Sequence, residues 1–361
     1  MLTRILIHNY RSLVNFELRP GRINLLLGYN GSGKTSIFAV LAAITDLLRG
    51  QAEIESVFPI DTLSTLGEGA QQKFELDLES PHGPMRYQLV VEHDRDDGTC
   101  RIVREQIDVK EIQLYSYSDG TVHVSGNYFQ FVADRSFFAM MEHTEQTAPA
   151  LAWLRDYLQN IWLLKLDPQT IPAVSHKDEA ALHVDGSNFP SWFRHLALER
   201  REQLQDAELA LRDVLPGFRS LSLQTAGRAR VLVARFEAPG KKTHDVDFDR
   251  LSDGQRALII LYVVLHAIKR DTGLLCLDEP DNFVAIREIQ PFLVELTKMC
   301  EDTDKQALLV SHSAEVVDFF SPSEAILLER PDGGATRVGD LRAGAGLKLS
   351  ELLARGWHGA R

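Results

Sequence analysis

Apolar positions change their spacing along the chain, and each spacing predicts a different kind of element. A continuous apolar run at Ile23–Leu27 ends in glycine, and helical residues follow over 35–48. A run of this kind is typical of a buried parallel strand that leads into a helix. Over 73–125 apolar and polar residues alternate, which predicts antiparallel strands, and Asp119-Gly120 marks a hairpin turn between two of them.

The remaining pattern predicts strands at both ends of the chain and helices between them. The expected elements are strands at 4–8 and 14–18, a helix at 150–160, a strand at 161–166, a polar helical segment at 187–213, strands at 220–224 and 231–236, a helix from Ser252, a strand at 274–277, a helix at 286–300 and a strand at 307–310. The alternation of helix and strand in the last third indicates parallel βα units. We therefore expect an α/β fold, a P-loop core interrupted by an antiparallel β lobe and an inserted helical lobe.

Composition narrows the class of protein. The chain has 361 residues, more than one hydrophobic core usually organises, and its 44% hydrophobic and 25% charged residues are typical of globular proteins. The three cysteines, Cys100, Cys276 and Cys300, are far apart and offer neither a disulfide framework nor a metal clip, which favours a reducing cytoplasm. We see no signal peptide and no apolar run of the ~20 residues that a membrane span needs.

Gly28-Tyr29-Asn30-Gly31-Ser32-Gly33-Lys34-Thr35 fits the pattern GxxxxGK[ST] and lies between an apolar strand and a helix. Backbone N–H groups of such a loop wrap a triphosphate, the lysine reaches the β- and γ-phosphates, and the hydroxyl holds Mg²⁺. We expect ATP to contact this loop. The predicted nucleotide-binding residues there are Asn30, Gly31, Ser32, Gly33, Lys34, Thr35 and Ser36.

A second strand, at 274–277, ends in two carboxylates. Asp278 at the strand end is suited to bind Mg²⁺, and Glu279 beside it is placed to accept a proton from an attacking water. Acidic pairs at loop entrances are often only solvated, but one that follows a phosphate loop in the same chain favours catalysis. We therefore expect an ATPase.

A second helix start lies at Leu251-Ser252-Asp253-Gly254-Gln255. Ser252 is a natural N-cap and Gly254 allows close backbone approach, so this helix end is suited to an anionic ligand, although an ordinary capped helix has the same pattern. One triphosphate meets both helix starts only if two chains face each other head to tail. The pattern therefore predicts ATP sandwiched in a homodimer.

The order of these motifs, followed by Ser311-His312 after the strand at 307–310, resembles the ABC-type ATPase head. Asn9-Tyr10-Arg11-Ser12-Leu13 before the phosphate loop is similar to the RecF/SMC/OLD branch. Asp185-Gly186-Ser187-Asn188 further resembles small stand-alone AAA/ABC "predicted ATPases" of bacterial defence or toxin–antitoxin-like operons.

This resemblance implies a role for each matching residue. Lys34, Glu279 and His312 are the catalytic residues, with His312 as the switch that contacts the γ-phosphate. Mg²⁺ is held by Thr35, Asp278 and a Q-loop glutamine, which is Gln169 or, alternatively, Gln130. Arg11 either approaches the nucleotide or is a surface arginine, and Ser252, Gly254 and Gln255 contact the γ-phosphate of the opposite subunit. Phe283-Val284-Ala285 departs from the family pattern, which bears on how the two subunits communicate.

The resemblance also implies one ABC-type ATPase head over residues 1–361. Its parts are a phosphate-loop part at 1–50, the β lobe at 70–150, the helical lobe at 170–245, and the part with the signature, acidic strand and switch histidine at 246–361.

Three functions remain open at this stage. The first is an ATPase whose ATP-driven dimerisation gates a partner effector, such as a nuclease, in defence against phage or foreign DNA, because residues 313–361 are too few for the Toprim nuclease domain of OLD-type proteins. The second is a RecF-like DNA clamp in repair. The net charge of −12 disfavours DNA binding overall. Between Arg194 and Lys242, however, there are ten Lys and Arg against six Asp and Glu, which is either a patch for DNA or a solvated helical face. The third is an ATP-responsive binding module; transport is disfavoured, since no membrane-coupling segment is evident.

Overall fold

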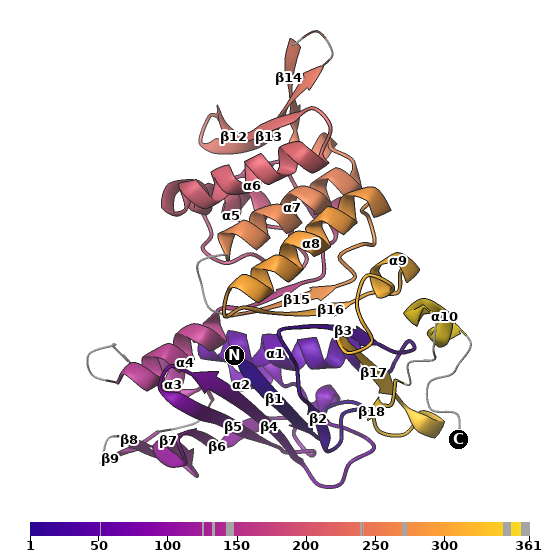
Figure 1. Ribbon diagram of the computed structural model, residues 1–361. Helices are drawn as coiled ribbons and strands as arrows, with labels where there is room; N and C mark the ends of the chain where they lie inside the picture. Colours follow the sequence, from indigo (N-terminus) through magenta and orange to yellow (C-terminus); the bar gives the residue numbers. More distant parts are fainter. Residues whose placement is uncertain are drawn as a thin grey trace.

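A six-stranded sheet crosses the middle of the molecule and separates two layers (Figure 1). The computed structural model describes residues 1–50, 52–124, 126–131, 134–141, 148–238, 240, 242–268, 273–341 and 348–354. The sheet has the order β10-β15-β16-β3-β17-β18, and all of its neighbouring strands are parallel except β17 and β18. Its strands are β3 (Ile23–Leu27), β10 (Ile161–Leu164), β15 (Leu274–Asp278), β16 (Gln306–Val310), β17 (Ala325–Glu329) and β18 (Arg337–Gly339).

Below this sheet lies an antiparallel sheet with the order β2-β1-β4-β5-β6-β7-β8-β9. Its strands are β1 (Leu2–His8), β2 (Phe16–Leu18), β4 (Gln71–Ser80), β5 (Gly83–His93), β6 (Cys100–Val109), β7 (Ile112–Ser118), β8 (Thr121–Val124) and β9 (Asn127–Gln130). The predicted hairpin turn at Asp119-Gly120 joins β7 to β8. Because β1 pairs with β4, the first two strands belong to this sheet and not to the sheet that carries the phosphate loop.

Helices cover both faces of the central sheet. Helix α1 (Lys34–Leu48) lies between the two large sheets, and α7 (Asp253–Ala267) and α8 (Ile286–Asp302) lie on the opposite face (Figure 1). The shorter helices are α2 (Ile54–Val57), α3 (Phe137–Met140), α4 (Pro149–Gln159), α9 (Ala314–Val317) and α10 (Leu349–Ala354), with 3-10 turns η1 (Ile60–Thr62), η2 (Pro168–Thr170), η3 (Phe248–Arg250) and η4 (Pro331–Gly333). None of the helices in the described part of the chain has the length and hydrophobicity that crossing a membrane requires.

The inserted lobe beyond α7 combines two helices with a small sheet. The helices are α5 (Phe189–Glu199) and α6 (Arg201–Val214), and the strands are β11 (Val174–Ser175), β12 (Phe218–Ala226), β13 (Ala229–Ala238) and β14 (Lys242–Asp247). The helical segment expected at 187–213 is broken at Arg200, whose φ of −135° leaves the helical region and whose guanidinium donates to the Ala267 carbonyl at the end of α7. Strand β14 was not expected, since its residues are mostly charged or polar.

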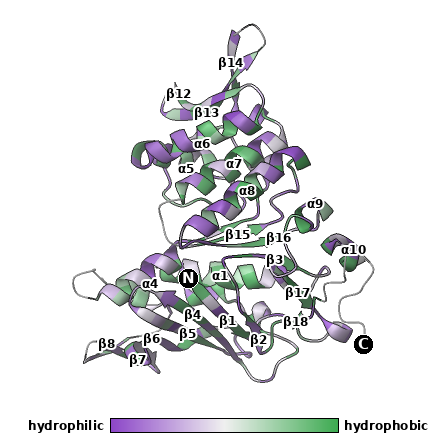
Figure 2. Ribbon diagram, viewed as in Figure 1, coloured by the Kyte–Doolittle hydropathy of each residue, from purple (hydrophilic) through white to green (hydrophobic). Residues whose placement is uncertain are grey.

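Two apolar cores lie on the two faces of the central sheet. The alternation of side chains along β3 places Leu25 and Leu27 in the core with α7 and α8, and Leu26 in the core with α1 and the antiparallel sheet. Hydropathy follows this division, because the central strands and the inner faces of α1 and α7 are the most hydrophobic parts of the ribbon (Figure 2). The expected α/β core with an antiparallel β lobe and an inserted lobe is thereby confirmed.

A carboxylate is buried inside the antiparallel sheet. Glu105 on β6 is 1% exposed and accepts hydrogen bonds from the hydroxyls of Tyr87 (2.9 Å), Tyr115 (2.9 Å) and Ser136 (2.7 Å). Burial raises the pKa of Glu105, and the three hydroxyl donors oppose that rise. Because Ser136 is also the N-cap of α3, this network attaches α3 to the sheet.

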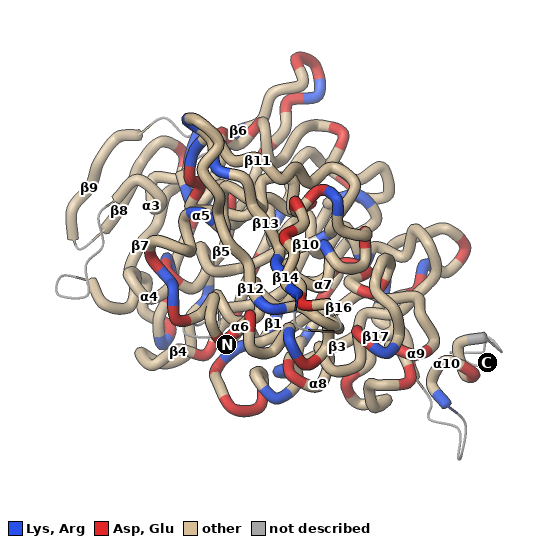
Figure 3. The backbone as a smooth tube through the Cα atoms, turned by 90° about the horizontal axis from the view of Figure 1, so that it is seen from above, with Lys and Arg blue, Asp and Glu red and all other residues tan. Residues whose placement is uncertain are grey.

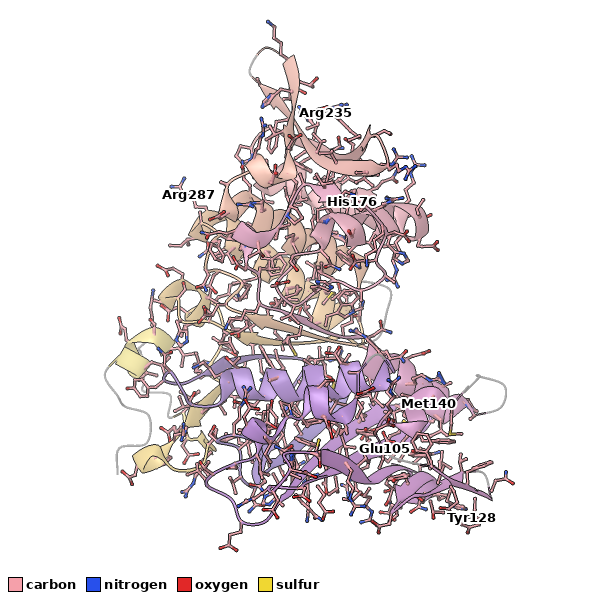
Figure 4. All side chains as sticks on the ribbon, turned by 180° about the vertical axis from the view of Figure 1, so that it is seen from behind. Glu105, Tyr128, Met140, His176, Arg235 and Arg287 are labelled. Carbon is pink, nitrogen blue, oxygen red and sulfur yellow. The ribbon has the colours of Figure 1, made fainter. Side chains whose placement is uncertain are left out.

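Removing one of these donors tests the network. We expect Tyr115→Phe to lower the free energy of unfolding by about 1.5–3 kcal/mol, because a buried carboxyl loses a partner that it cannot replace with water. Tyr128→Phe is the matched control, since Tyr128 is 72% exposed on β9 at the rim of the molecule, whereas Glu105 lies inside it (Figure 4). Urea unfolding measures both, and equal midpoints for the two variants would contradict the assignment.

Candidate functional site: the nucleotide pocket

The phosphate loop joins β3 to α1 as its motif predicts. Gly33 precedes α1 with a φ of 100°, and no side chain caps the first N–H groups of the helix, so these donors are available to an anion. Gly28 has a φ of 144°, and a Cβ atom there would lie 2.3 Å from the Leu328 carbonyl oxygen on β17. Glycine is therefore required at the start of the loop, where it packs against the neighbouring strand.

The ammonium of Lys34 is folded into the loop. Its Nζ donates to the carbonyl oxygens of Gly28 (2.5 Å) and Tyr29 (3.1 Å). Desolvation lowers the pKa of Lys34, and the nearby carboxylates of Asp278 and Glu279 counteract that effect. The Lys34 ammonium is therefore bound to the phosphate loop and interacts electrostatically with both carboxylates.

Asp278 lies at the end of β15, where its carboxylate contacts one residue at the start of α1 and one residue after β10. Its side chain is only 4% exposed, and its Oδ2 accepts a hydrogen bond from the Thr35 hydroxyl at 3.4 Å and pairs with Lys165 Nζ at 3.1 Å. Thr35 comes from the start of α1, and Lys165 follows β10. The predicted partners Thr35 and Asp278 are therefore brought together, and Lys165 is an additional contact that the motifs did not indicate.

Glu279 adopts a left-handed backbone conformation with a φ of 54°. A non-glycine residue in this region is strained, and such strain is concentrated at functional sites. Its N–H donates to the Val310 carbonyl at the end of β16 (2.8 Å), and its carboxylate accepts from Asn282 Nδ2 (2.7 Å). His312 Nε2 lies 3.6 Å from Glu279 Oε1. The predicted base and the predicted switch histidine are thus neighbours.

These residues line one pocket with a volume of about 440 Å³. It is bounded by Arg11, Ser12, Asn30, Gly31, Ser32, Gly33, Lys34, Thr35, Ser36, Lys165, Asp278, Glu279, Val310, His312 and Arg330. All predicted phosphate-loop residues, both carboxylates, the histidine and Arg11 meet here. Lys165 and Arg330 were missed. Lys165 carries a weak signal, a cation inside the apolar strand expected at 161–166, whereas Arg330 belongs to no motif and donates to the Gly31 carbonyl at 3.1 Å.

A buried polar network sets the position of Arg11. The turn before it is held because Gln72 on β4 donates to the Asn9 carbonyl (3.3 Å) and to the Thr62 hydroxyl (3.1 Å). The Arg11 N–H in turn donates to the Thr62 carbonyl at 2.7 Å. Asn9 and Arg11 both have positive φ, at 65° and 49°. The antiparallel sheet therefore holds a strained turn that brings Arg11 to the pocket.

The signature residues lie outside this pocket, at the start of α7. Ser252 caps the helix by accepting from the Gln255 N–H (3.2 Å), and Gln255 Oε1 accepts from the Ser252 N–H (3.1 Å), which is a complete capping box. Neither Ser252, Gly254 nor Gln255 lines the pocket that contains Lys34. Within one chain, the two anion-binding helix starts therefore do not meet.

The two glutamines proposed for the Q-loop also lie away from the pocket. Gln169, in η2, donates from Nε2 to Asp253 Oδ2 at 3.3 Å and so contacts the start of α7. Gln130 lies on the edge strand β9, where it donates to the Thr121 hydroxyl at 3.2 Å. Of the two, only Gln169 is on the segment that leads out of β10, beside the pocket residue Lys165.

Gly254 packs directly on the segment that follows the acidic pair. A Cβ atom at Gly254 would lie 2.6 Å from the Phe283 carbonyl oxygen. The same segment is fixed at its other end, because Ser311 donates to Asp281 (3.0 Å) and Asn282 donates to Glu279. The segment 281–283 thus connects the base in the pocket with the signature on the outer face.

The basic region between Arg194 and Lys242 lies in the inserted lobe. Arg219 pairs with Glu237 at 2.8 Å and Arg235 pairs with Asp245 at 2.7 Å, so acidic neighbours neutralise part of the excess charge. Seen from above, Lys and Arg alternate with Asp and Glu around β12–β14 (Figure 3).

The residues present fit Mg²⁺ bound together with a nucleotide. A hydroxyl and a carboxylate, Thr35 and Asp278, already face each other at 3.4 Å, and both are oxygen donors of the kind that Mg²⁺ prefers. In the described part of the chain, no group of three or more His, Cys, Asp or Glu side chains is arranged to hold a metal alone. Two protein oxygens are enough for Mg²⁺, which completes its shell with phosphate and water.

Comparisons with known proteins give the chain a family and structures of the same fold. The family model described as "AAA domain, putative AbiEii toxin, Type IV TA system" matches residues 23–318. Two solved structures share the fold. The Smc head bound to the C-terminal winged-helix domain of ScpA has a TM-score of 0.57 at 12% identity, covering 98% of this chain and 99% of that one. The Smc head with an extended coiled coil, bound to the C-terminal domain of ScpA from Pyrococcus furiosus, has a TM-score of 0.53 at 12% identity, covering 99% and 98%. No curated protein sequence matches.

The close approach at Gly254 gives a test of the connection between signature and base. We expect Gly254→Ala to lower the free energy of unfolding by about 1–3 kcal/mol, because the added methyl group has no space beside the Phe283 carbonyl. Gly21→Ala is the control, since a Cβ there meets its nearest atom at 3.6 Å and needs no unusual backbone angle. Denaturant unfolding of the nucleotide-free chain measures both. Equal stability of the two variants would show that the segment 281–283 does not rest on Gly254.

Proposed function

Since this chain belongs to the family described as "AAA domain, putative AbiEii toxin, Type IV TA system", we propose that it hydrolyses ATP in a head-to-tail homodimer that gates a partner effector. The effector is a nuclease that acts in defence against phage or foreign DNA. One observation carries the ATPase part: a single pocket joins Lys34 and Thr35 of the phosphate loop to Asp278 and Glu279.

Five of the pocket residues have a defined part in the hydrolysis. Water attacks the γ-phosphorus, the bond from the γ-phosphorus to the bridging oxygen breaks with its electron pair going to ADP, and Glu279 accepts the proton of the water. Lys34 leaves the loop carbonyls to bind the β- and γ-phosphates. A bound Mg²⁺, held through Thr35 and Asp278, supplies positive charge to these phosphates. His312, 3.6 Å from Glu279, orients the base or contacts the γ-phosphate.

The homodimer accounts for the position of the signature. The start of α7 carries the backbone N–H groups of its first turn and the Ser252 hydroxyl, which accepts from the Gln255 N–H, and these groups lie outside the pocket of their own chain. In a head-to-tail dimer they close the pocket of the other chain over the γ-phosphate. ATP is then bound by both chains, and its hydrolysis releases them.

The partner effector is supported by the comparisons rather than by the pocket. Support comes from the family description, which names a putative toxin of a type IV TA system, and from the two Smc heads, which were solved with ScpA bound. A protein partner is favoured over direct DNA binding, because Glu237 and Asp245 neutralise the two arginines Arg219 and Arg235 of the basic region. When ATP binding brings the two heads together, a partner bound to them would be held in a different arrangement.

Replacing the base tests the reaction. We expect Glu279→Gln to bind Mg·ATP as wild type does, to lower kcat about 10²- to 10³-fold, and to accumulate dimers with ATP by light scattering, because the water keeps its proton. Lys34→Ala should lose ATP binding, and Glu301→Gln, an exposed position on α8, should behave as wild type. Undiminished hydrolysis by Glu279→Gln would overturn the role of this residue.

The same variants test the effector. Glu279→Gln, locked as a dimer by ATP, should enrich a nuclease from extracts of the native cell, and Lys34→Ala should not. Nuclease activity that stays the same with either variant would contradict gating.

Mixing variants tests the composite site. Lys34→Ala and Ser252→Arg should each be inactive alone, but a one-to-one mixture should recover about a quarter of wild-type hydrolysis, because half of the dimers then hold one intact site. Lys34→Ala mixed with Glu279→Gln is the control, since both changes affect the same part of the site and no dimer is repaired. Absence of recovery in the first mixture, with both variants folded, would rule out the head-to-tail arrangement.

A further inference from the structure

The register of the central sheet places a lysine against the acidic strand. β10 pairs with β15 in parallel, and Leu164 is the partner of Leu277. The next residue after Leu164 therefore lies beside Asp278, and Lys165 Nζ is 3.1 Å from Asp278 Oδ2. The pair is asymmetric, because the Lys165 side chain is 55% exposed on the pocket side whereas that of Asp278 is 4% exposed.

Segment 184–188, which contains Asp185-Gly186-Ser187-Asn188, holds Lys165 in this place. The Lys165 N–H donates to the Val184 carbonyl at 2.8 Å, and the Asp167 N–H donates to the Asp185 carbonyl at 2.9 Å. These bonds end β10 at Leu164, two residues earlier than the strand expected at 161–166, and turn the chain along the stretch 184–188.

Asn188 makes the stretch rigid. Its Oδ1 accepts from the His183 N–H (2.8 Å), and its Nδ2 donates to Glu179 (2.8 Å) and to the Ala181 carbonyl (2.9 Å). Gly186, with a φ of 76°, allows the turn to pack 3.0 Å from the Leu166 side chain, measured from an ideal Cβ. The resemblance gave no role to Asp185-Gly186-Ser187-Asn188. In the structure this motif is part of the segment that supports Lys165.

Stability alone does not account for this lysine. An ion pair with a nearly buried carboxylate supports the fold, but it does not require the ammonium to be 55% exposed on the pocket side. Its ammonium instead shares the pocket with Lys34, Arg11 and Arg330, and this set of cations faces the space where a triphosphate would lie. It is also bound to the same Asp278 oxygen as Thr35, so it neutralises the carboxylate that is suited to Mg²⁺.

We propose that Lys165 is a catalytic cation of the ATP site: it neutralises Asp278 in the nucleotide-free chain and moves to the γ-phosphate when ATP binds. It serves at the position after β10 where a Q-loop glutamine was expected, while Gln169 contacts the signature helix through Asp253. The inference rests on the proposed ATPase function. A cation at the γ-phosphate stabilises the charge on the transferred group and distinguishes ATP from ADP.

The experiment measures nucleotide discrimination as well as turnover. In the Glu279→Gln background, where ATP persists, the Kd values of ATP and ADP are measured with Mg²⁺ for chains with Lys165, Lys165→Met and Lys165→Arg. Lys177→Met is the matched control, because Lys177 is 77% exposed and pairs with Glu179 outside the pocket. The kcat of each variant is measured with Glu279 intact, and thermal unfolding reports the fold.

We expect Lys165→Met to reduce the preference for ATP over ADP at least tenfold and to lower kcat about 10²-fold, in a chain that thermal unfolding shows to be folded. Lys165→Arg, which keeps the charge, should restore the preference for ATP in part. Lys177→Met should match wild type in both measurements.

The proposal is overturned if Lys165→Met keeps the wild-type preference and kcat, or if it weakens ATP and ADP equally and lowers the melting temperature, since either result assigns Lys165 a structural role only. Failure of the ATPase function itself gives a different result: the wild-type chain would neither bind ATP more tightly than Lys34→Ala nor hydrolyse it.

Discussion

The parallel pairing of β10, β15, β16 and β3 is the constraint on which the site depends. Parallel strands end at the same edge of a sheet, so the residues that follow each of them meet there. β3 contributes the phosphate loop, β15 the acidic pair, β16 Ser311 and His312, and β10 Lys165. Most of the chain separates Lys34 from Asp278, and only this pairing brings their side chains into one pocket of about 440 Å³.

The site concentrates features that would be costly elsewhere in the fold. Asp278 is a nearly buried carboxylate, and Glu279 and Arg11 have left-handed backbones. Each is held by several contacts from rigid elements: Asp278 by Thr35 and Lys165, and Glu279 by the end of β16 and by Asn282. The antiparallel sheet holds the Arg11 turn through Gln72. Much of the surrounding structure thus serves to fix a few atoms around the nucleotide.

Two short segments join the pocket to the signature face. Segment 281–283 runs from the base to the Phe283 carbonyl, against which Gly254 packs, and the segment from Lys165 to Gln169 runs from the acidic strand to Asp253. Both begin at residues that would contact the nucleotide of their own chain, and both end at the helix that would contact the nucleotide of a second chain. A structural change in the pocket can therefore reach the signature helix through directly packed residues. This holds although Phe283-Val284-Ala285 departs from the family pattern.

The sequence by itself determined the elements whose cause is local. The apolar run before glycine gave β3, the phosphate loop and α1, the alternation of polarity gave the antiparallel strands, and Ser252 gave the capped start of α7, because neighbouring residues decide backbone angles, capping and periodicity. Tertiary structure alone decided which segments are neighbours. It placed β1 in the antiparallel sheet, broke the expected helix at Arg200, directed Gln169 to Asp253, and brought Lys165 and Arg330 to the pocket. Strand register and packing between distant segments set these contacts, and no local pattern encodes them.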